Sequence, residues 1–271
     1  EPSSYREPVG NLKEKFSDDY EIGEVPVFVG PWDAICSAVG SGLSEEGDSM
    51  VVAGSTTVFS LCTGKDSSDS NKPYLTPDTN LYLGAENMNS AIDWVKEKHD
   101  RSLNEKETDE LIETAEEGEG PIFVPFLDGE RENPNLKGMI AGLESNQEIS
   151  DLLMAALEGS IYHIRKEFEE IGENSTEELR ISGGGSKSPL RNQIRANCLG
   201  ISVKTLGTDE PSALGVSILA SVSTGIYSDL DEATENMVNI EQVYEPDEEK
   251  FKKHQKRFQK YKHFYEARKE V

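Results

Sequence analysis

The chain has 271 residues and carries 52 acidic against 27 basic side chains, a formal net charge of −25. This length is enough for one large or two small domains with a buried core. No apolar run reaches the roughly 18 residues that a membrane span needs, so we expect no membrane-spanning segment. The negative charge also argues against binding to nucleic acid or to anionic membranes, because both would repel the chain.

The acidic residues are spread along the whole chain, and apolar periodic segments recur between them. This pattern predicts a folded protein with an acidic surface rather than a disordered chain. Concentrated salt would screen the self-repulsion of such a surface. The composition therefore suggests a halophilic source with a salt-rich cytoplasm.

The cysteines and histidines show no metal-site or disulfide spacing. Cys36, Cys62 and Cys198 are far apart in sequence, which is typical of small buried residues in the reducing cytoplasm. His254 and His263 lie in a charged segment near the end of the chain, and we expect both to be solvated. We also find no pattern typical of a secretory signal peptide.

The first third of the chain predicts a lead-in, a small helix and a strand meander. Residues 1–24 are polar and irregular, residues 26–30 predict a short buried strand, and residues 33–42 predict a helix of small residues. Residues 49–64 predict two strands joined by a polar corner, and residues 80–86 a third strand. Three successive strands indicate an antiparallel meander.

Helices alternate with strands in the remainder of the chain. Helices are expected at 88–99, 103–117, 146–171, 188–200, 211–225, 230–238 and 247–270, and strands at 122–126, 179–182 and 201–206. The helix at 211–225 is nearly all apolar and small, so we expect it to be buried. The whole order predicts an α/β fold in which helices flank a mixed sheet.

The terminal helix at 247–270 carries aromatic residues on one stripe, namely Phe251, Phe258, Tyr261 and Tyr265. An aromatic stripe at helical spacing indicates packing on the domain itself or on a partner subunit. The pattern favours the domain core and leaves a homodimer open.

Residues 182–190, SGGGSKSPL, place three glycines between a strand and a helix that opens at Ser188. Glycines let a ligand approach the backbone, and free amides at a helix N-terminus favour phosphate. The segment is neither a P-loop nor a dinucleotide-binding fingerprint. A plain strand-to-helix turn is the alternative interpretation.

Residues 53–59, AGSTTVF, form a corner between two predicted strands that offers amides and hydroxyls together. This composition is typical of an anion-binding hairpin, but the segment taken by itself favours an ordinary polar turn. The segment PFLDGEREN places Arg131 beside acidic residues, which is typical of a solvated loop.

Asp33 stands between a Trp and a run of small residues. Its simplest interpretation is the N-cap of the helix that follows. A carboxylate near a phosphate-binding corner can instead accept a proton from an attacking hydroxyl. The residues around Asp33 alone favour the helix cap.

These segments together resemble the C-terminal half of the FGGY carbohydrate kinases, the family of xylulokinase, gluconokinase and glycerol kinase. The likeness rests on the order of GPWDAICSAVGSG, Gly54-Ser55-Thr56, VPFLDGER and GGGSKSPLRNQI followed by ALGVSILA, from about residue 24 to 240. The chain departs from the family pattern in its Gly-Ser-Thr corner, where Gly-Thr-Ser is usual, and in the ENPN after GER. The resemblance implies a ribonuclease H-like, actin-like ATPase domain.

The resemblance also implies roles for residues of this sequence. Asp33 would be the general base, and Gly54, Ser55 and Thr56 would hold the β- and γ-phosphates of ATP. The nucleotide would pass close to the remaining members of the expected site, which are Gly183, Gly184, Gly185 and Ser188. Mg²⁺ would arrive with ATP, and the acceptor would be a sugar or polyol, with a pentulose such as xylulose expected first.

The family has two domains with the active site between them, and nothing before residue 24 resembles the phosphate motif of the first. We therefore expect residues 1–45 to be the tail of an absent N-terminal domain with the hinge that carries Asp33, and residues 46–271 to be the ATP-side domain. Such a chain alone would bind nucleotide weakly and have little or no kinase activity. The alternatives are a glycerol or gluconate kinase of the same family, a non-catalytic actin-like nucleotide-binding module, and an acidic scaffold without a ligand.

Overall fold

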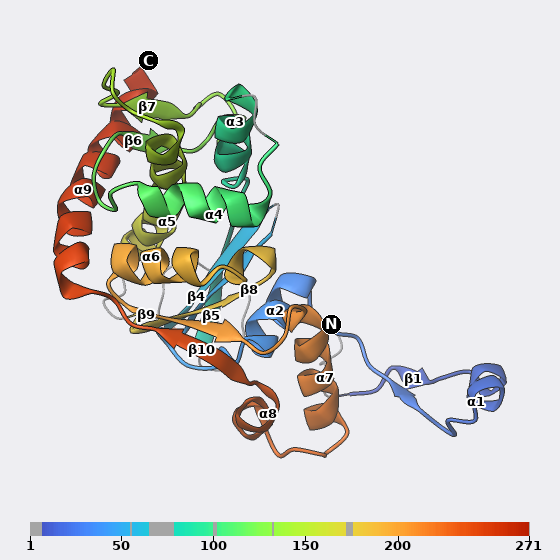
Figure 1. Cartoon of the computed structure of the whole chain (residues 1–271). Coiled ribbons are helices and arrows are strands. Elements are labelled where there is room, and N and C mark those ends of the chain that lie inside the picture. The colour runs from blue at the N-terminus through green and yellow to red at the C-terminus, as the bar shows by residue number, and fades with distance from the viewer. Residues whose placement is uncertain are drawn as a thin grey trace.

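The computed structural model describes residues 7–54, 56–64, 79–99, 102–131, 133–171 and 176–270. Its centre is a six-stranded sheet in the order β10-β9-β8-β3-β4-β5 (Figure 1). The strands are β3 (Ser49–Ala53), β4 (Thr57–Gly64), β5 (Thr79–Glu86), β8 (Glu178–Ser182), β9 (Ser202–Leu206) and β10 (Ile240–Tyr244). β3, β8 and β9 run parallel, whereas β4, β5 and β10 are antiparallel to their neighbours. The predicted mixed sheet and its meander are confirmed.

Helices cover both faces of the sheet (Figure 1). One face carries α2 (Asp33–Gly40), α7 (Pro211–Ser223) and α8 (Leu230–Met237). The other face carries α3 (Ser90–Lys98), α4 (Glu105–Thr114), α5 (Ile149–Ile171), α6 (Pro189–Leu199) and α9 (Glu248–Ala267). Each of these helices lies within a few residues of its predicted range.

The central strand β3 is buried on both sides, which explains its continuous apolar sequence. Met50 packs with α2 and α7, whereas Val51 packs in the larger cluster under α5 and α6. Side chains of a strand alternate between its two faces, so adjacent apolar residues serve two cores. The three cysteines are buried free thiols, as expected.

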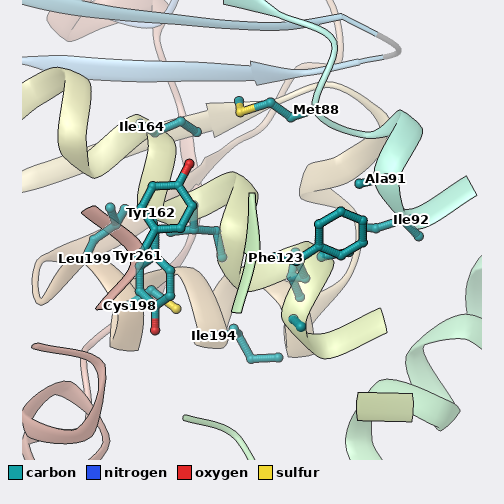
Figure 2. Packing of buried hydrophobic residues seen from close by; sticks show 14 of the residues in the cluster. Met88, Ala91, Ile92, Phe123, Tyr162, Ile164, Ile194, Cys198, Leu199 and Tyr261 are labelled. Carbon is teal, nitrogen blue, oxygen red and sulfur yellow. The ribbon is translucent and has the colours of Figure 1, made fainter. Parts of the chain in front are cut away.

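The larger core joins the helices of one face to the short hairpin of β6 (Ile122–Val124) and β7 (Met139–Ala141). Figure 2 shows Ile92, Phe123, Tyr162, Ile194 and Tyr261, which come from α3, β6, α5, α6 and α9. Burial of each such side chain contributes on the order of 1.5–3 kcal/mol to folding.

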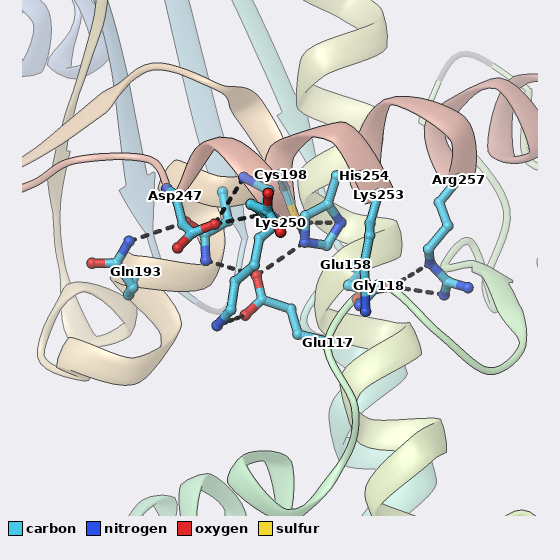
Figure 3. Close-up of polar contacts among 12 residues, drawn as sticks. Glu117, Gly118, Glu158, Gln193, Cys198, Asp247, Lys250, Lys253, His254 and Arg257 are labelled. Atoms are coloured by element: carbon cyan, nitrogen blue, oxygen red, sulfur yellow. Dashed lines mark hydrogen bonds and ion pairs between the residues drawn. The ribbon is translucent and has the colours of Figure 1, made fainter.

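The aromatic stripe of α9 packs on the domain itself, because Phe258, Tyr261 and Tyr265 are buried. His254 lies in the same inward face and is fully buried, so its expected solvation is wrong (Figure 3). Its Nε2 donates to Glu117 at 3.0 Å, and the Tyr162 hydroxyl lies 2.6 Å from Nδ1. The charged residues around His254 in the sequence suggest an exposed position. The helix instead buries His254 against the carboxylate of Glu117.

Two further expectations about burial are wrong. Residues 26–30 do not form a buried strand: β2 (Pro26–Val27) pairs only with β1 (Gly10–Asn11), and Val29 is 52% exposed. These strands belong to an arm, with α1 (Glu14–Tyr20), that extends away from the sheet (Figure 1). Helix α7 is buried on one face only, since Val216 on its other face is 52% exposed.

Helices α2 and α7 approach so closely that their backbones touch. A Cβ atom on Gly40 would lie 1.8 Å from the carbonyl oxygen of Pro211, and one on Gly215 would lie 1.8 Å from that of Cys36. The Ser37 and Ser212 hydroxyls are 2.6 Å apart across the same contact. This contact fixes the position of α2, and with it the residue that begins the helix.

In the part of the chain that the structure describes, no helix has both the length and the apolar character needed to cross a bilayer.

Candidate functional site

The glycine turn and the polar corner lie side by side because β3 and β8 are parallel neighbours. Val52 pairs with Ser182, so Gly54 and Gly183 follow at the same edge of the sheet. Gly183 has a φ of +82°, which side chains disfavour. A Cβ atom on Gly185 would lie 2.7 Å from the Ala53 Cβ. The turn therefore needs glycine at both positions to lie against the end of β3.

Gly184 is different, because a Cβ atom there would meet nothing within 4 Å. The turn is held by its neighbours: the Ser186 hydroxyl donates to the Gly183 carbonyl at 2.7 Å, and the Asn192 amide donates to the Ser186 carbonyl at 2.7 Å. Ser188 caps α6, because its hydroxyl accepts from the Arg191 amide at 3.1 Å. The backbone at Gly184 is thus both ordered and open to a ligand.

The corner between β3 and β4 includes Gly54 and Thr56, while Ser55 lies outside the described residues. The side-chain amide of Asn89 donates to the Gly54 carbonyl and ties the corner to the start of α3. Asn89 occupies the N-cap position of α3, but its side chain makes no capping bond. From sequence it looks like an ordinary cap, so its contact with the corner could not be found that way.

Asp33 is exposed and is the first residue of α2, behind Trp32 in the N-cap position. The interpretation of Asp33 as the N-cap is therefore wrong. Its carboxylate accepts from the Ala34 amide at 2.8 Å, and the positive end of the helix dipole favours a negative charge there. The carboxylate is placed by a helix whose far side is fixed against α7.

Asp33 and Thr56 line the same cavity, which has a volume of about 1290 Å³. Tyr82, Glu86 and Arg131 line it as well. The Arg131 amide donates to the two carboxylate oxygens of Glu86 at 3.4 and 3.3 Å, and burial raises the pKa of Glu86. The cavity therefore joins two of the expected site segments, the start of α2 and the polar corner, to the loop that carries Arg131.

The glycine turn does not line this cavity. The turn packs against Ala53, which precedes the polar corner, and the corner lines the cavity through Thr56. The arrangement has the parts for transfer of a charged group: open backbone on one side and an exposed carboxylate on the other. Among the described residues, no group of three His, Cys, Asp or Glu side chains is placed to hold a metal ion.

Comparison with known proteins points to one family. Residues 50–224 match the model of the FGGY family of carbohydrate kinases, C-terminal domain. The xylulose kinase of Staphylococcus epidermidis is 24% identical over 97% of this chain and 56% of its own length. Glycerol kinase 1 of Thermotoga maritima is 29% identical over 82% of this chain and 48% of its own length. The chain thus spans about half the length of these curated relatives.

Solved structures show the same fold. The ligand-bound xylulose kinase from Lactobacillus acidophilus superposes with a TM-score of 0.88 at 19% identity, over 98% of this chain and 56% of that one. Plasmodium falciparum glycerol kinase with ADP gives 0.79 at 21% identity, over 95% of this chain and 54% of that one. The expected actin-like ATPase fold is confirmed. With the match over residues 50–224, the chain belongs to the FGGY family of carbohydrate kinases, whose C-terminal domain it contains.

Proposed function

We propose that this chain is the ATP-side half of a kinase that transfers the γ-phosphoryl group of ATP to a hydroxyl of a sugar or polyol. One observation carries the proposal. The glycine turn and the polar corner meet at the ends of β3 and β8, and the corner shares its cavity with the carboxylate of Asp33. Phosphoryl transfer needs these parts, because positioning and charge stabilisation supply most of its catalysis.

The nucleotide is assigned to the glycine turn and the polar corner. The open backbone at Gly184 would let the α-phosphate and adenosine approach Gly183–Gly185, with Ser188 near the base. Gly54, Ser55 and Thr56 would hold the β- and γ-phosphates. Mg²⁺ bound to ATP would supply charge neutralisation at the transferred phosphoryl group.

Asp33 is assigned as the general base. It is exposed in the cavity and ordered by the first turn of α2, so it can accept the proton of an acceptor hydroxyl. The second wall of the site is assigned to an N-terminal domain, because the curated relatives are about twice as long as this chain. A cleft with one wall excludes water poorly, so we expect little or no kinase activity from this chain alone.

A pentulose such as xylulose is the first candidate acceptor, since similar proteins include several named xylulose kinases. Glycerol and gluconate are the next candidates, because relatives and structural neighbours carry those names as well. A non-catalytic nucleotide-binding module is the second candidate function. The carboxylate at position 33 favours the kinase, because a module that only binds nucleotide does not need it.

The substitution Asp33→Asn in a full-length kinase containing this chain tests the proposal. We expect the rate of sugar phosphorylation to fall by about 10²–10⁴-fold, because an amide cannot accept the proton. ADP affinity should stay unchanged. Asp231→Asn is the matched control, since Asp231 is an exposed acid in the first turn of α8. Undiminished phosphorylation by the Asp33 variant would refute the base assignment and favour the binding module.

A further inference from the structure

Arg195 of α6 lies directly beneath the glycine turn. A Cβ atom on Gly185 would be 3.5 Å from its Nη2 atom. Its Nη1 donates to Asn192 Oδ1 at 2.7 Å, and the amide of the same Asn192 holds the Ser186 carbonyl. Asn192 is fully buried, so the guanidinium and the turn are fixed to each other through one rigid side chain.

Arg195 forms no close ion pair in the part of the chain that the structure describes, and Asp109 acts on it only from a longer distance. No described carboxylate lies within 4 Å of its guanidinium, although the protein has a net charge of −25. Arg191, one turn earlier, forms ion pairs with Glu105 at 2.7 Å and Asp109 at 2.6 Å. The sequence thus gives two arginines of one helix very different surroundings.

The surroundings of Arg195 penalise its charge. Burial, together with the positive charge of Arg191, outweighs the attraction of Asp109 and lowers the pKa of Arg195 to about 10. A partly buried guanidinium without a close counter-charge destabilises the fold, and an anion that binds beside it reduces that penalty. The Cβ position of Gly185 touches both Ala53 and Arg195, so this charge lies at the junction of the turn and the polar corner.

We propose that Arg195 binds a phosphate group of the nucleotide at the glycine turn. The inference rests on the proposed function, and it adds a cationic contact to a site whose other assigned donors are backbone amides and hydroxyls. Guanidinium and phosphate match in geometry, since the planar fork can donate two parallel hydrogen bonds. Asn192 acts as the positioning residue that aims this fork, because it occupies Nη1 and leaves Nη2 beside the turn.

The test compares ADP with adenosine, because only ADP carries the phosphates. Calorimetric titrations would use the 271-residue chain and its Arg195→Gln variant at one KCl concentration. We expect the variant to bind ADP about 10- to 100-fold more weakly, the usual loss for a charge-assisted hydrogen bond. Its adenosine affinity should stay within about twofold, and Arg195→Lys should lose less ADP affinity than Arg195→Gln.

Arg191→Gln is the matched control, because the ion pairs of Arg191 already satisfy its charge; the ratio of ADP to adenosine affinity should not change. Equal losses for ADP and adenosine in Arg195→Gln would show that Arg195 only supports the turn. Unchanged ADP affinity would also overturn the proposal. If the folded wild-type chain bound neither compound, the nucleotide site itself would be wrong, and the Arg195 assignment would fall with it.

Discussion

Glu117 is one of the residues that tie the terminal helix to the rest of the domain (Figure 3). Its Oε1 accepts from His254 Nε2 at 3.0 Å and from the Asn197 amide at 2.8 Å, and its Oε2 accepts from Lys250 at 2.8 Å. Burial alone would raise the pKa of Glu117, but these three donors outweigh it and lower the pKa. The ionised carboxylate is therefore the form that stabilises the fold.

The substitution Glu117→Gln should lower the free energy of unfolding by about 1.5–3 kcal/mol at pH 7, because it removes charge-assisted hydrogen bonds. A lowered folded pKa gives stability above the unfolded pKa of about 4.3 and loses it as pH falls through the folded pKa. The difference between wild type and variant should thus shrink in acid. Urea denaturation at several pH values measures it.

Glu116→Gln is the control for this prediction, because Glu116 is 71% exposed in its pair with Lys253. An exposed ion pair contributes at most about 1 kcal/mol, so this variant should change little at any pH. Equal losses for the two variants would show that Glu117 does not anchor α9.

At the residue scale, sequence patterns find the segments of the site better than the contacts within it. The three glycines at 183–185 are visible in sequence, but only the structure shows that Gly184 is the open one. Asn89 and Arg195 were missed, because their contacts with Gly54 and Gly185 join positions 35 and 10 residues apart. Such contacts depend on how elements pack, which no local pattern records.

At the scale of elements, the contact between α2 and α7 links packing to function. Their glycines let the two backbones touch, and α2 carries Asp33 at its exposed end. Side chains between the helices would push α2 outward and move the carboxylate relative to Thr56. The small-residue sequences of both helices are therefore a requirement of the core and, under the proposed role of Asp33, of the site as well.

Gly215→Ala should lower the free energy of unfolding by at least about 2 kcal/mol, because overpacking a close contact forces the backbones apart. Ser217→Ala is the matched control on the exposed face of the same helix and should change stability by less than about 0.5 kcal/mol. Chemical denaturation of both variants checks this. A Gly215 variant as stable as the control would mean that the helices do not touch there.

Element type was predictable from periodicity, whereas exposure was not. The apolar sequence of α7 predicts full burial, but Val216 and Ala213 face outward because α2 and α8 cover only one side. Strand β10 was not predicted, since four of its five residues are exposed and it lacks a buried apolar face. It forms because it pairs with β9: Ile240 of β10 lies opposite Leu206 of β9, which is 34 residues earlier in the chain.

At the scale of the whole molecule, the proposal makes this chain one wall of a cleft. Its fold superposes on those of a xylulose kinase and a gluconate kinase over 98% of this chain and 56% of each of theirs. The net charge of −25 adds self-repulsion that salt screens, so nucleotide binding should be measured where the Debye length is short.

The most direct test of this account is calorimetric titration of Mg-ATP and ADP into the 271-residue chain, in about 2 M KCl, with the variants Gly184→Leu and Gly30→Leu. Neither glycine has a neighbour within 4 Å of its Cβ position, so both variants should fold. We expect saturable binding by wild type and Gly30→Leu, and binding at least about tenfold weaker by Gly184→Leu, because leucine fills the space of the ligand. Equal binding by the two variants, or no binding by folded wild type, would contradict a nucleotide site at the ends of β3 and β8.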